Sequence, residues 1–289
     1  MTDRLAFRTL MALASILLLC LGAILVVPFK VVWPGVSWWL VCCSMLMPHL
    51  AMPMPVGNEG SVVAAVSAGL LLSMMVGNSA TTAWRLGWAT YRLLRSTQAA
   101  RLPPPPVVAR LANRLKLTNA VVVVAGGKPF SFCYGLWRPR ICLSQGLIEL
   151  LTEAELEAVL HHEAYHLQRR EPLRMALAIC LSRLFFFAPL LAELRDCYLA
   201  EKEMAADAAA IAVSGRAALA GALHKLVTVN KPVVLPGWAV VAGLSVTAQR
   251  VDRLIQPLAK PSWAPSRWSI ITTLALFAAG CLWTVAGLG

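Results

Sequence analysis

Four long apolar segments constrain the fold of this 289-residue chain more than any other feature. They cover residues 10–27, 36–55, 61–83 and 268–288. Each has about the 20 residues that a helix needs to cross the hydrocarbon core of a bilayer. Only 14% of all residues are charged, whereas soluble domains have about a quarter. We therefore predict a multi-span α-helical membrane protein, with the lipid bilayer as its first partner.

The basic residues predict the orientation of these helices. Lys and Arg outnumber Asp and Glu by 26 to 14, and most of them lie between the third and fourth segments. Because Lys and Arg concentrate in cytoplasmic loops, we expect residues 85–267 in the cytoplasm and both termini outside. Arg4 and Arg8 favour the opposite orientation and are outnumbered. The basic residues flank apolar segments and form no folded basic face, so we expect no binding of nucleic acid.

A stretch of mixed character precedes the fourth segment. Pro103–Pro106 predicts a stiff extended linker. Three short strands are expected where β-branched or aromatic residues are bounded by glycine or proline. They cover residues 121–124, 130–134 and 140–144. A capping box of Thr152 and Glu155 predicts a helix that ends before Pro172, and a second helix is expected over residues 192–212.

The first of these helices carries the motif His162-Glu163-Ala164-Tyr165-His166. Its two histidines are four residues apart, so they project from one helix face and can share one zinc ion. Zinc lowers the pKa of a bound water, and Glu163 is placed to take its proton as that water attacks a peptide carbonyl. A chance occurrence is expected in roughly one chain of this length in a hundred. The alternative is a polar helix face with two surface histidines.

A catalytic zinc needs a third protein ligand and one open position. A third histidine six residues after His166 is absent, because Pro172 stands there. Glu203 and Asp207 lie four residues apart on the second expected helix. Glu203 can bind zinc, while Asp207 can accept the free N–H of a ligating imidazole. Glu201 points to nearly the opposite side, so Glu203 is favoured. The alternative is a solvated charged face.

This pairing depends on the apolar stretch over residues 173–191, which is about long enough to cross a membrane. A single crossing would put His162 and Glu203 on opposite sides, and no shared metal site would form. Arg183 lies in the middle of the stretch, where a charge costs several kcal/mol in hydrocarbon. We therefore predict that this stretch does not span the membrane.

Other residues carry weaker hypotheses. His161 is about 100° around the helix from His162, which favours a structural role. His224 is a candidate donor to the oxyanion of the tetrahedral intermediate. His49 lies in an apolar segment, where a partnered structural role is favoured. The strand over residues 130–134 is either an internal strand or an edge that pairs with an extended substrate.

The chain resembles the BlaR/MecR-type membrane peptidases, a gluzincin group related more distantly to the HtpX and Ste24 proteases. The matching stretches are YGLWRPRICLSQGL, LEAVLHHEAYHLQRREPL and FFFAPLLAELRDCYLAEKEMAADAA. The resemblance covers residues 121–212 in detail and the four-span layout in outline. It implies one Zn²⁺ per chain, held by three ligands at a cytoplasmic site near the membrane. It also implies a general base and an outer partner, which is a carboxylate that accepts the N–H of a ligand histidine. The ligands are His162, His166 and Glu203, the base is Glu163, and the outer partner is Asp207.

The chain departs from the antibiotic-sensing members of that group. It carries no Ser-x-x-Lys or Lys-Thr-Gly, so we expect no β-lactam binding by that chemistry and no penicillin-binding sensor domain after the last span. Glu171 stands where the group commonly has Asp, and Leu219 where it commonly has Tyr. A separate sensor or regulator protein is the partner expected in place of a built-in sensor.

The sequence therefore predicts a membrane-embedded zinc endopeptidase with a cytoplasmic α+β gluzincin domain that cleaves protein substrates. The predicted parts are three transmembrane helices over residues 1–95, a linker over 96–106, the protease domain over 107–262 and a fourth transmembrane helix over 263–289. One alternative is a regulatory peptidase that cuts a repressor or itself. Another is a non-catalytic membrane scaffold that retains the fold, and the intact Glu163 argues against it.

Overall fold

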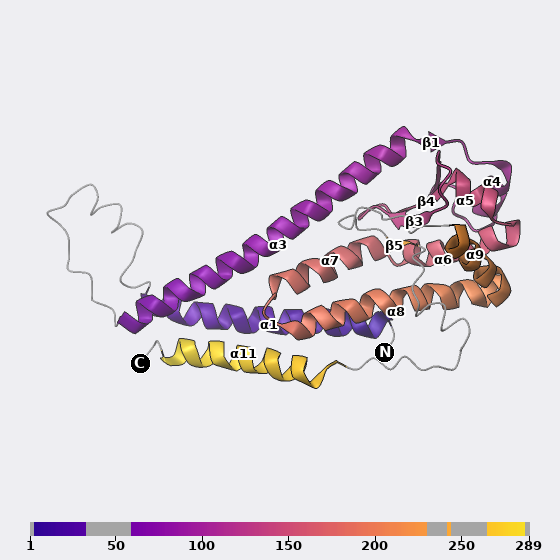
Figure 1. The fold of residues 1–289 in the computed structure, drawn as a ribbon. Coiled ribbons are helices and arrows are strands. Elements are labelled where there is room, and N and C mark those ends of the chain that lie inside the picture. The colour runs from indigo at the N-terminus through magenta and orange to yellow at the C-terminus, as the bar shows by residue number, and fades with distance from the viewer. Residues whose placement is uncertain (1–2, 33–58, 230–241, 244–264, 287–289) are drawn as a thin grey trace, which may run out of the picture. The chain divides into compact units, whose positions relative to one another are not determined.

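The computed structural model describes residues 3–32, 59–229, 242–243 and 265–286 (Figure 1). This part of the chain is mostly helical, with one small mixed sheet. The helices are α1 (Asp3–Val32), α3 (Glu59–Ala99), α4 (Pro106–Arg114), α5 (Gln145–Leu150), α6 (Glu153–Gln168), α7 (Glu171–Leu184), α8 (Pro189–Ser214), α9 (Arg216–Val229) and α11 (Arg267–Ala286). Within the described ranges, none of the helices combines the length and the hydropathy needed to cross a membrane. The apolar segment over residues 36–55 and His49 lie outside the described residues.

The chain divides into two compact units, each assembled from three separate stretches. Unit 1 comprises Met1–Phe7, Thr81–Cys180 and Arg195–Ala264. Unit 2 comprises Arg8–Ala80, Leu181–Leu194 and Pro265–Gly289. The run Pro103–Pro106 lies inside unit 1, where it connects the first strand to α4.

A five-stranded sheet in the order β1-β2-β4-β3-β5 forms the centre of unit 1. The strands are β1 (Arg101–Leu102), β2 (Val121–Val124), β3 (Ser131–Tyr134), β4 (Arg140–Ser144) and β5 (Ala242–Gly243). β2 and β4 are parallel, and the other pairs are antiparallel. The three predicted strands are confirmed, and β3 begins one residue later than expected. β3 pairs with β4 on one side and with β5 on the other, so it is an internal strand.

The two faces of this sheet pack against different helices. Neighbouring residues of a strand project to opposite faces. Val121, Val123, Ile141 and Leu143 belong to a core with buried residues of α4, α5, α6 and α9. Their neighbours in the strands pack with residues from the end of α3. That second cluster comprises Val122, Val124, Phe132, Tyr134 and Cys142, with Leu93, Leu94, Ala100 and Phe130 against it.

The N-terminus of α6 is fixed by the predicted capping box. The Thr152 backbone N–H donates to the Glu155 carboxylate at 2.8 Å, and the Glu155 N–H donates to the Thr152 hydroxyl at 3.4 Å. Lys225 of α9 donates to the same carboxylate at 2.6 Å. A Cβ at Gly221 of α9 would lie 2.6 Å from Glu155 Oε1. The glycine therefore lets α9 pack closely against the start of the helix that carries the histidines.

Glu155→Gln is expected to lower the stability at pH 7 by about 1 kcal/mol, or roughly 2–4 °C in Tm. Burial acts to raise the pKa of Glu155, but Lys225 and Thr152 hold it below its ordinary value. A lowered pKa means that the carboxylate stabilises the fold above its ordinary pKa and loses this effect as the pH falls. Thermal unfolding should therefore show a difference in Tm between the wild type and Glu155→Gln that becomes smaller at acidic pH. Glu153→Gln, at an exposed position of the same helix, is the control, and an equal loss there would contradict the assignment.

The stretch over residues 173–191 is not one helix. α7 ends at Leu184 and α8 begins at Pro189. The turn between them belongs to a core of unit 2, which includes Leu17, Met75 and Phe185. α8 then ends before Gly215, whose φ of +82° is a conformation that glycine adopts without strain. The chain therefore reverses between the two predicted motifs, as the shared metal site requires.

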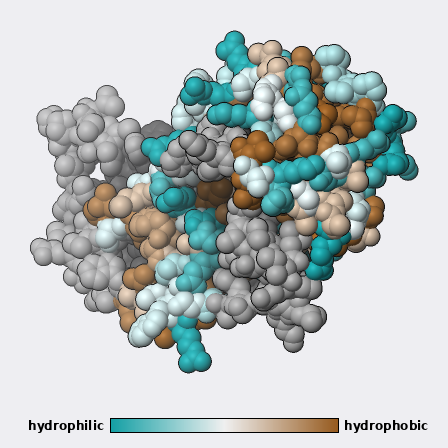
Figure 2. Space-filling model, turned by 45° about the vertical axis from the view of Figure 1, so that its right-hand side comes forward, coloured by the Kyte–Doolittle hydropathy of each residue, from teal (hydrophilic) through white to brown (hydrophobic). Residues whose placement is uncertain are grey.

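Large apolar side chains are exposed on the helices of unit 2. They include Leu19 on α1, Leu70 and Met74 on α3, and Leu274 and Leu282 on α11. Figure 2 shows brown hydrophobic patches between the teal side chains on one face of the molecule. Contiguous exposed apolar surface marks a site of contact with protein or membrane.

Candidate metal centre

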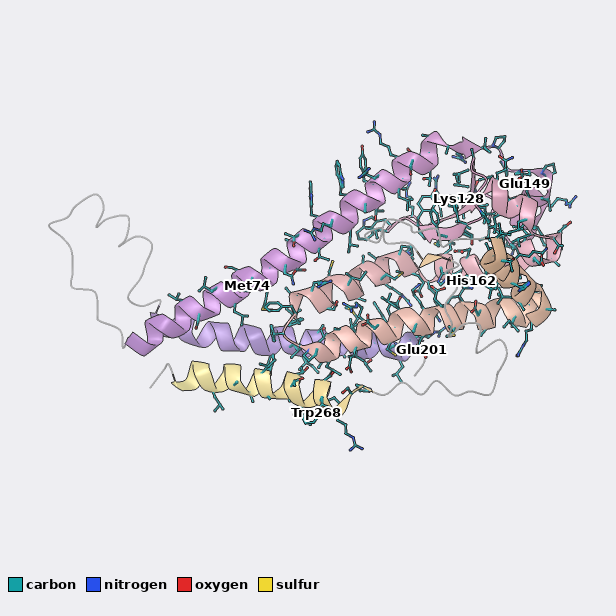
Figure 3. The ribbon with its side chains drawn as sticks, in the orientation of Figure 1. Met74, Lys128, Glu149, His162, Glu201 and Trp268 are labelled. Carbon is teal, nitrogen blue, oxygen red and sulfur yellow. The ribbon has the colours of Figure 1, made fainter. Side chains whose placement is uncertain are left out.

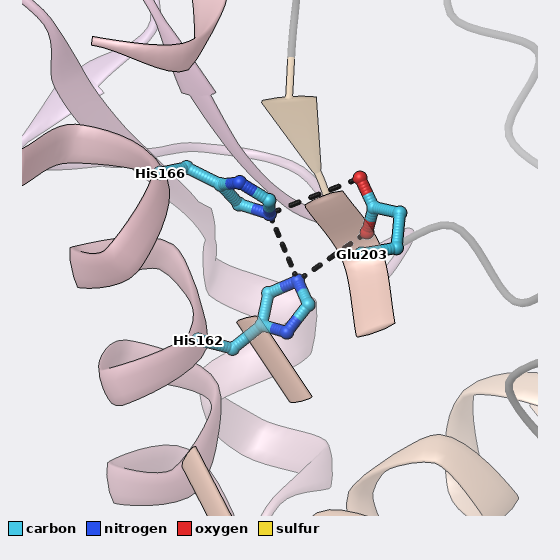
Figure 4. A group of neighbouring side chains, drawn as sticks. All are labelled: His162, His166 and Glu203. Atoms are coloured by element: carbon cyan, nitrogen blue, oxygen red, sulfur yellow. Dashed lines mark hydrogen bonds and ion pairs between the residues drawn. The ribbon is translucent and has the colours of Figure 1, made fainter. Parts of the chain in front are cut away.

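Two helices of unit 1 bring together the three residues that the sequence predicts as metal ligands (Figure 4). His162 and His166 come from α6, Glu203 comes from α8, and all three are buried. The Nε2 atoms of the two histidines are 3.2 Å apart. The Glu203 carboxylate oxygens lie 3.5 Å from His162 Nε2 and 3.8 Å from His166 Nε2.

This donor set fits a zinc ion. Tetrahedral zinc with bonds of about 2.0–2.1 Å separates neighbouring ligand atoms by about 3.3–3.4 Å. The two Nε2 atoms are 3.2 Å apart, close to that value, and each lies 3.5–3.8 Å from a different oxygen of the Glu203 carboxylate. Two imidazoles and one carboxylate leave the fourth position for water or substrate, which is the arrangement of a catalytic site. In the described part of the chain, no other group of three His, Cys, Asp or Glu side chains comes as close.

Asp207 lies behind the first histidine. Its Oδ1 is 2.9 Å from His162 Nδ1, while the Nε2 of the same ring faces Glu203 and His166. Asp207 is one turn after Glu203 on α8, so one helix supplies both the ligand and the outer carboxylate. A carboxylate that accepts the Nδ1–H fixes the tautomer that leaves Nε2 free to bind a metal.

Asp207→Asn is expected to lower the metal affinity by about 10–100-fold, because the amide no longer holds the His162 ring in the binding tautomer. Competition with a chromophoric chelator would measure this loss in the purified full-length protein. Glu201→Gln, on the same helix and outside the ligand group, should retain the wild-type affinity. Equal affinities in wild type and Asp207→Asn would contradict the role assigned to Asp207.

Glu163 is fully buried on α6, between the histidines in sequence. Its Oε1 accepts a hydrogen bond of 2.8 Å from the hydroxyl of Ser131, at the start of β3. No sequence pattern singles out Ser131, because a strand pattern does not reveal which residue faces a distant helix. The alternation along β3 and the contact of β3 with α6 account for its position.

The family of the protein follows from comparison with known proteins. The family model described as BlaR1 peptidase M56 matches residues 50–255, which is more than half of the chain. The chain belongs to the BlaR1 peptidase M56 family. The family consists of metal-dependent peptidases, and the matched range includes both histidines, Glu163 and Glu203. A search of curated proteins gave no match.

The charge of Glu203 in this M56 peptidase is balanced by a buried lysine. Lys202 Nζ donates a hydrogen bond to Glu203 Oε1. Burial acts to raise the pKa of Glu203, but Lys202 and the two ligand histidines hold it well below its ordinary range. The carboxylate is therefore ionised and ready to bind a cation. Cys133 of β3 is a neutral thiol, because burial and then the charge of Glu163 raise its pKa.

Three further residues that the sequence singled out lie outside the ligand group. His161 is 3.9 Å from the carboxylate of Glu157 on α6, and burial lowers its pKa. His224 is exposed on α9. Glu201 is on α8 and His162 is on α6, as Figure 3 shows. None of them joins the cluster of His162, His166 and Glu203.

The first turn of α1 packs on the metal-binding helix. Asp3 is buried and accepts hydrogen bonds from the Tyr165 hydroxyl at 3.1 Å and from Arg169 at 2.9 Å. The Phe7 ring lies 5.1 Å from the ring of Tyr198 on α8. These residues all belong to unit 1. Asp3 therefore contacts the residue that precedes His166.

Proposed function

We propose that this M56 peptidase is a zinc-dependent endopeptidase of the cytoplasmic membrane that cleaves protein substrates at the cytoplasmic face. The observation that carries the proposal is the ligand group itself. His162, His166 and Glu203 each offer one ligand atom, and these atoms lie within 4.8 Å of one another. Glu163, a carboxylate that can serve as the base, is buried next to the first ligand. A scaffold without catalysis has no need of this base.

The residues of the site divide the chemistry of peptide hydrolysis among them. A zinc ion, when bound, supplies a Lewis acid that lowers the pKa of water and polarises the scissile carbonyl. His162, His166 and Glu203 would hold the ion. Glu163 takes the proton of the attacking water and returns it to the leaving amine. Ser131 orients the Glu163 carboxylate by donating to its Oε1 at 2.8 Å.

The membrane location is supported by the four apolar segments and by the apolar side chains exposed on α1, α3 and α11. We place the N-terminus on the cytoplasmic side, together with the active site, so only two of the three apolar segments before residue 85 would cross the bilayer. Asp3 contacts the metal-binding helix, and Arg4 and Arg8 favour the same side. A fluorescent protein that folds only in the cytoplasm, fused before residue 1, should be bright. A dark but expressed fusion would contradict this orientation.

Metal removal tests the proposed activity. The purified full-length protein is expected to contain about one zinc per chain and to cleave an unstructured protein such as casein. A chelator should abolish cleavage, and added zinc should restore it. Stoichiometric zinc without cleavage of casein or of a panel of membrane proteins would favour the scaffold. Absence of bound zinc from protein that is folded by circular dichroism would contradict the metal site.

One observation favours the regulatory alternative, in which the chain cuts itself. β5 comes from the segment between α9 and α11 and pairs antiparallel with Phe132 and Cys133 of β3. β3 is the strand that provides Ser131, and both β3 and β5 contact α6. An extended backbone of the chain itself therefore lies where a peptide substrate would pair. If the chain cuts itself, mass spectrometry of the zinc-loaded protein should reveal fragments cut near residues 242–243. A chain that stays intact would contradict self-cleavage, and other proteins would then be the substrates.

A further inference from the structure

A cavity of about 370 Å³ lies in unit 1, between the end of α3 and the sheet. Its walls include Gln98 of α3, Val122 of β2 and Tyr134 of β3. Val122 and Tyr134 belong to the sheet face that α3 covers. Ser131 lies on the opposite face, because it is three residues from Tyr134 along the strand. The cavity is therefore separated from the metal centre by the thickness of the sheet.

Three arginines line this cavity: Arg101 of β1, Arg138 of the β3–β4 turn and Arg140 of β4. All three are exposed. Among the described residues, none of the ion pairs includes any of them. Burial raises the pKa of Tyr134 in the cavity wall, and Arg140 and Arg101 oppose that rise. Three like charges without a carboxylate partner make the cavity attractive to an anion.

The β3–β4 turn positions Trp137 and Arg138, two of the residues that line the cavity. Gly135 has a φ of +93°, and a Cβ there would lie 2.8 Å from the Arg138 carbonyl oxygen. The tight turn therefore requires glycine. It presents Trp137, which is 76% exposed, next to Arg138 at the cavity. An aromatic ring beside guanidinium groups suits a ligand that has an apolar part as well as an anionic part.

A stripe of exposed aromatic side chains on α3 leads to this cavity. Trp84, Trp88 and Tyr91 follow one another at helical spacing, with ring centroids 6.3 Å and 5.9 Å apart. Gln98 of the cavity wall is seven residues after Tyr91, two turns further along the same face. Trp and Tyr are enriched where a membrane protein passes the lipid headgroups, and Arg binds phosphate there in a bidentate manner.

We infer that this cavity binds the phosphate group of an anionic phospholipid, with the aromatic stripe of α3 lying at the level of the lipid headgroups. Arg101, Arg138 and Arg140 would contact the phosphate, and Trp137 would cover the glycerol region. The inference rests on the membrane location proposed above and is independent of the peptidase activity. A phospholipid satisfies the arginines and the aromatic stripe together, whereas free phosphate satisfies only the arginines.

Lipid titration of the detergent-solubilised full-length protein tests this inference. Short-chain phosphatidylglycerol, phosphatidylcholine of equal chain length and inorganic phosphate would be titrated separately, with binding read by microscale thermophoresis. We expect phosphatidylglycerol to bind at least tenfold more tightly than either of the others. The triple variant Arg101→Gln, Arg138→Gln, Arg140→Gln should lose this preference. Trp137→Ala should weaken phosphatidylglycerol binding and leave phosphate binding unchanged.

A matched variant controls for net charge. Arg110→Gln, Arg114→Gln, Lys128→Gln removes three positive charges from side chains that do not line the cavity, and it should retain the preference. Thermal unfolding of each variant verifies that it is folded. Equal binding of the two lipids, phosphate binding as tight as that of phosphatidylglycerol, or an unchanged preference in the cavity variant would each overturn the inference. Membrane fractionation, zinc content and casein cleavage are separate readouts, so a failed lipid titration leaves the proposed function standing.

Discussion

Glu163→Gln is expected to lower kcat for peptide hydrolysis by roughly 10²–10⁴-fold while the zinc content stays near that of the wild type. The amide cannot accept the proton of the attacking water, so the step that Glu163 performs loses its base. Metal binding should persist because the three ligand atoms come from His162, His166 and Glu203. Single-turnover cleavage assays and metal analysis on the same preparation would measure both quantities.

Two further variants make this result specific. Glu153→Gln changes an exposed carboxylate on the same helix and should cleave like the wild type. Ser131→Ala removes the hydrogen bond of 2.8 Å to Glu163 and should lower kcat by less than Glu163→Gln. A Glu163→Gln protein that cleaves at the wild-type rate would show that another group is the base. Loss of zinc in this variant would show that Glu163 supports the metal site.

His166→Ala is expected to abolish both zinc binding and the stabilisation that zinc provides. Loss of a ligand should weaken binding by more than the roughly 10–100-fold expected for an outer partner. Zinc that binds only the folded protein stabilises it by about 2.7 kcal/mol when its concentration is 100 times the Kd. Thermal unfolding with and without zinc should therefore show a rise in Tm for the wild type and none for the variant.

His161→Ala is the matched control for this experiment. His161 precedes the first ligand on α6, contacts Glu157 and lies outside the ligand group. Its replacement should preserve the rise in Tm and the cleavage of protein substrates. A rise in Tm that survives in His166→Ala would contradict the ligand assignment. A rise that disappears in His161→Ala would show that the helix, rather than a specific ligand, is responsible.

The local elements and the pairing of the two motifs could be predicted because their signals are local and periodic. The β-branched run at residues 121–124 predicts the strand β2. The capping box at Thr152 predicts where α6 begins. Helical spacing of four residues places Glu203 and Asp207 on one face of α8, as it does the two histidines on α6. The stretch over residues 173–191, which carries Arg183, is divided between α7 and α8, so the two motifs can meet.

Contacts between residues far apart in the chain could not be predicted from these signals. Asp3 and Tyr165 are separated by 162 positions, and their hydrogen bond depends on how α1 packs. β1 and β5 have two residues each, too short for any periodic pattern. The assignment of residues 1–7 to the same unit as α6 likewise rests on contacts that no local pattern indicates.

Because the two units are interleaved along the chain, the metal site can be completed only late in translation. Asp3 and Phe7 leave the ribosome early, yet their partners on and beside α6 and on α8 are synthesised more than 150 residues later. At 5–20 residues per second, translation from residue 1 to Asp207 takes roughly 10–40 s. The metal centre has no complete ligand set before that point, so a nascent chain cannot hydrolyse its neighbours.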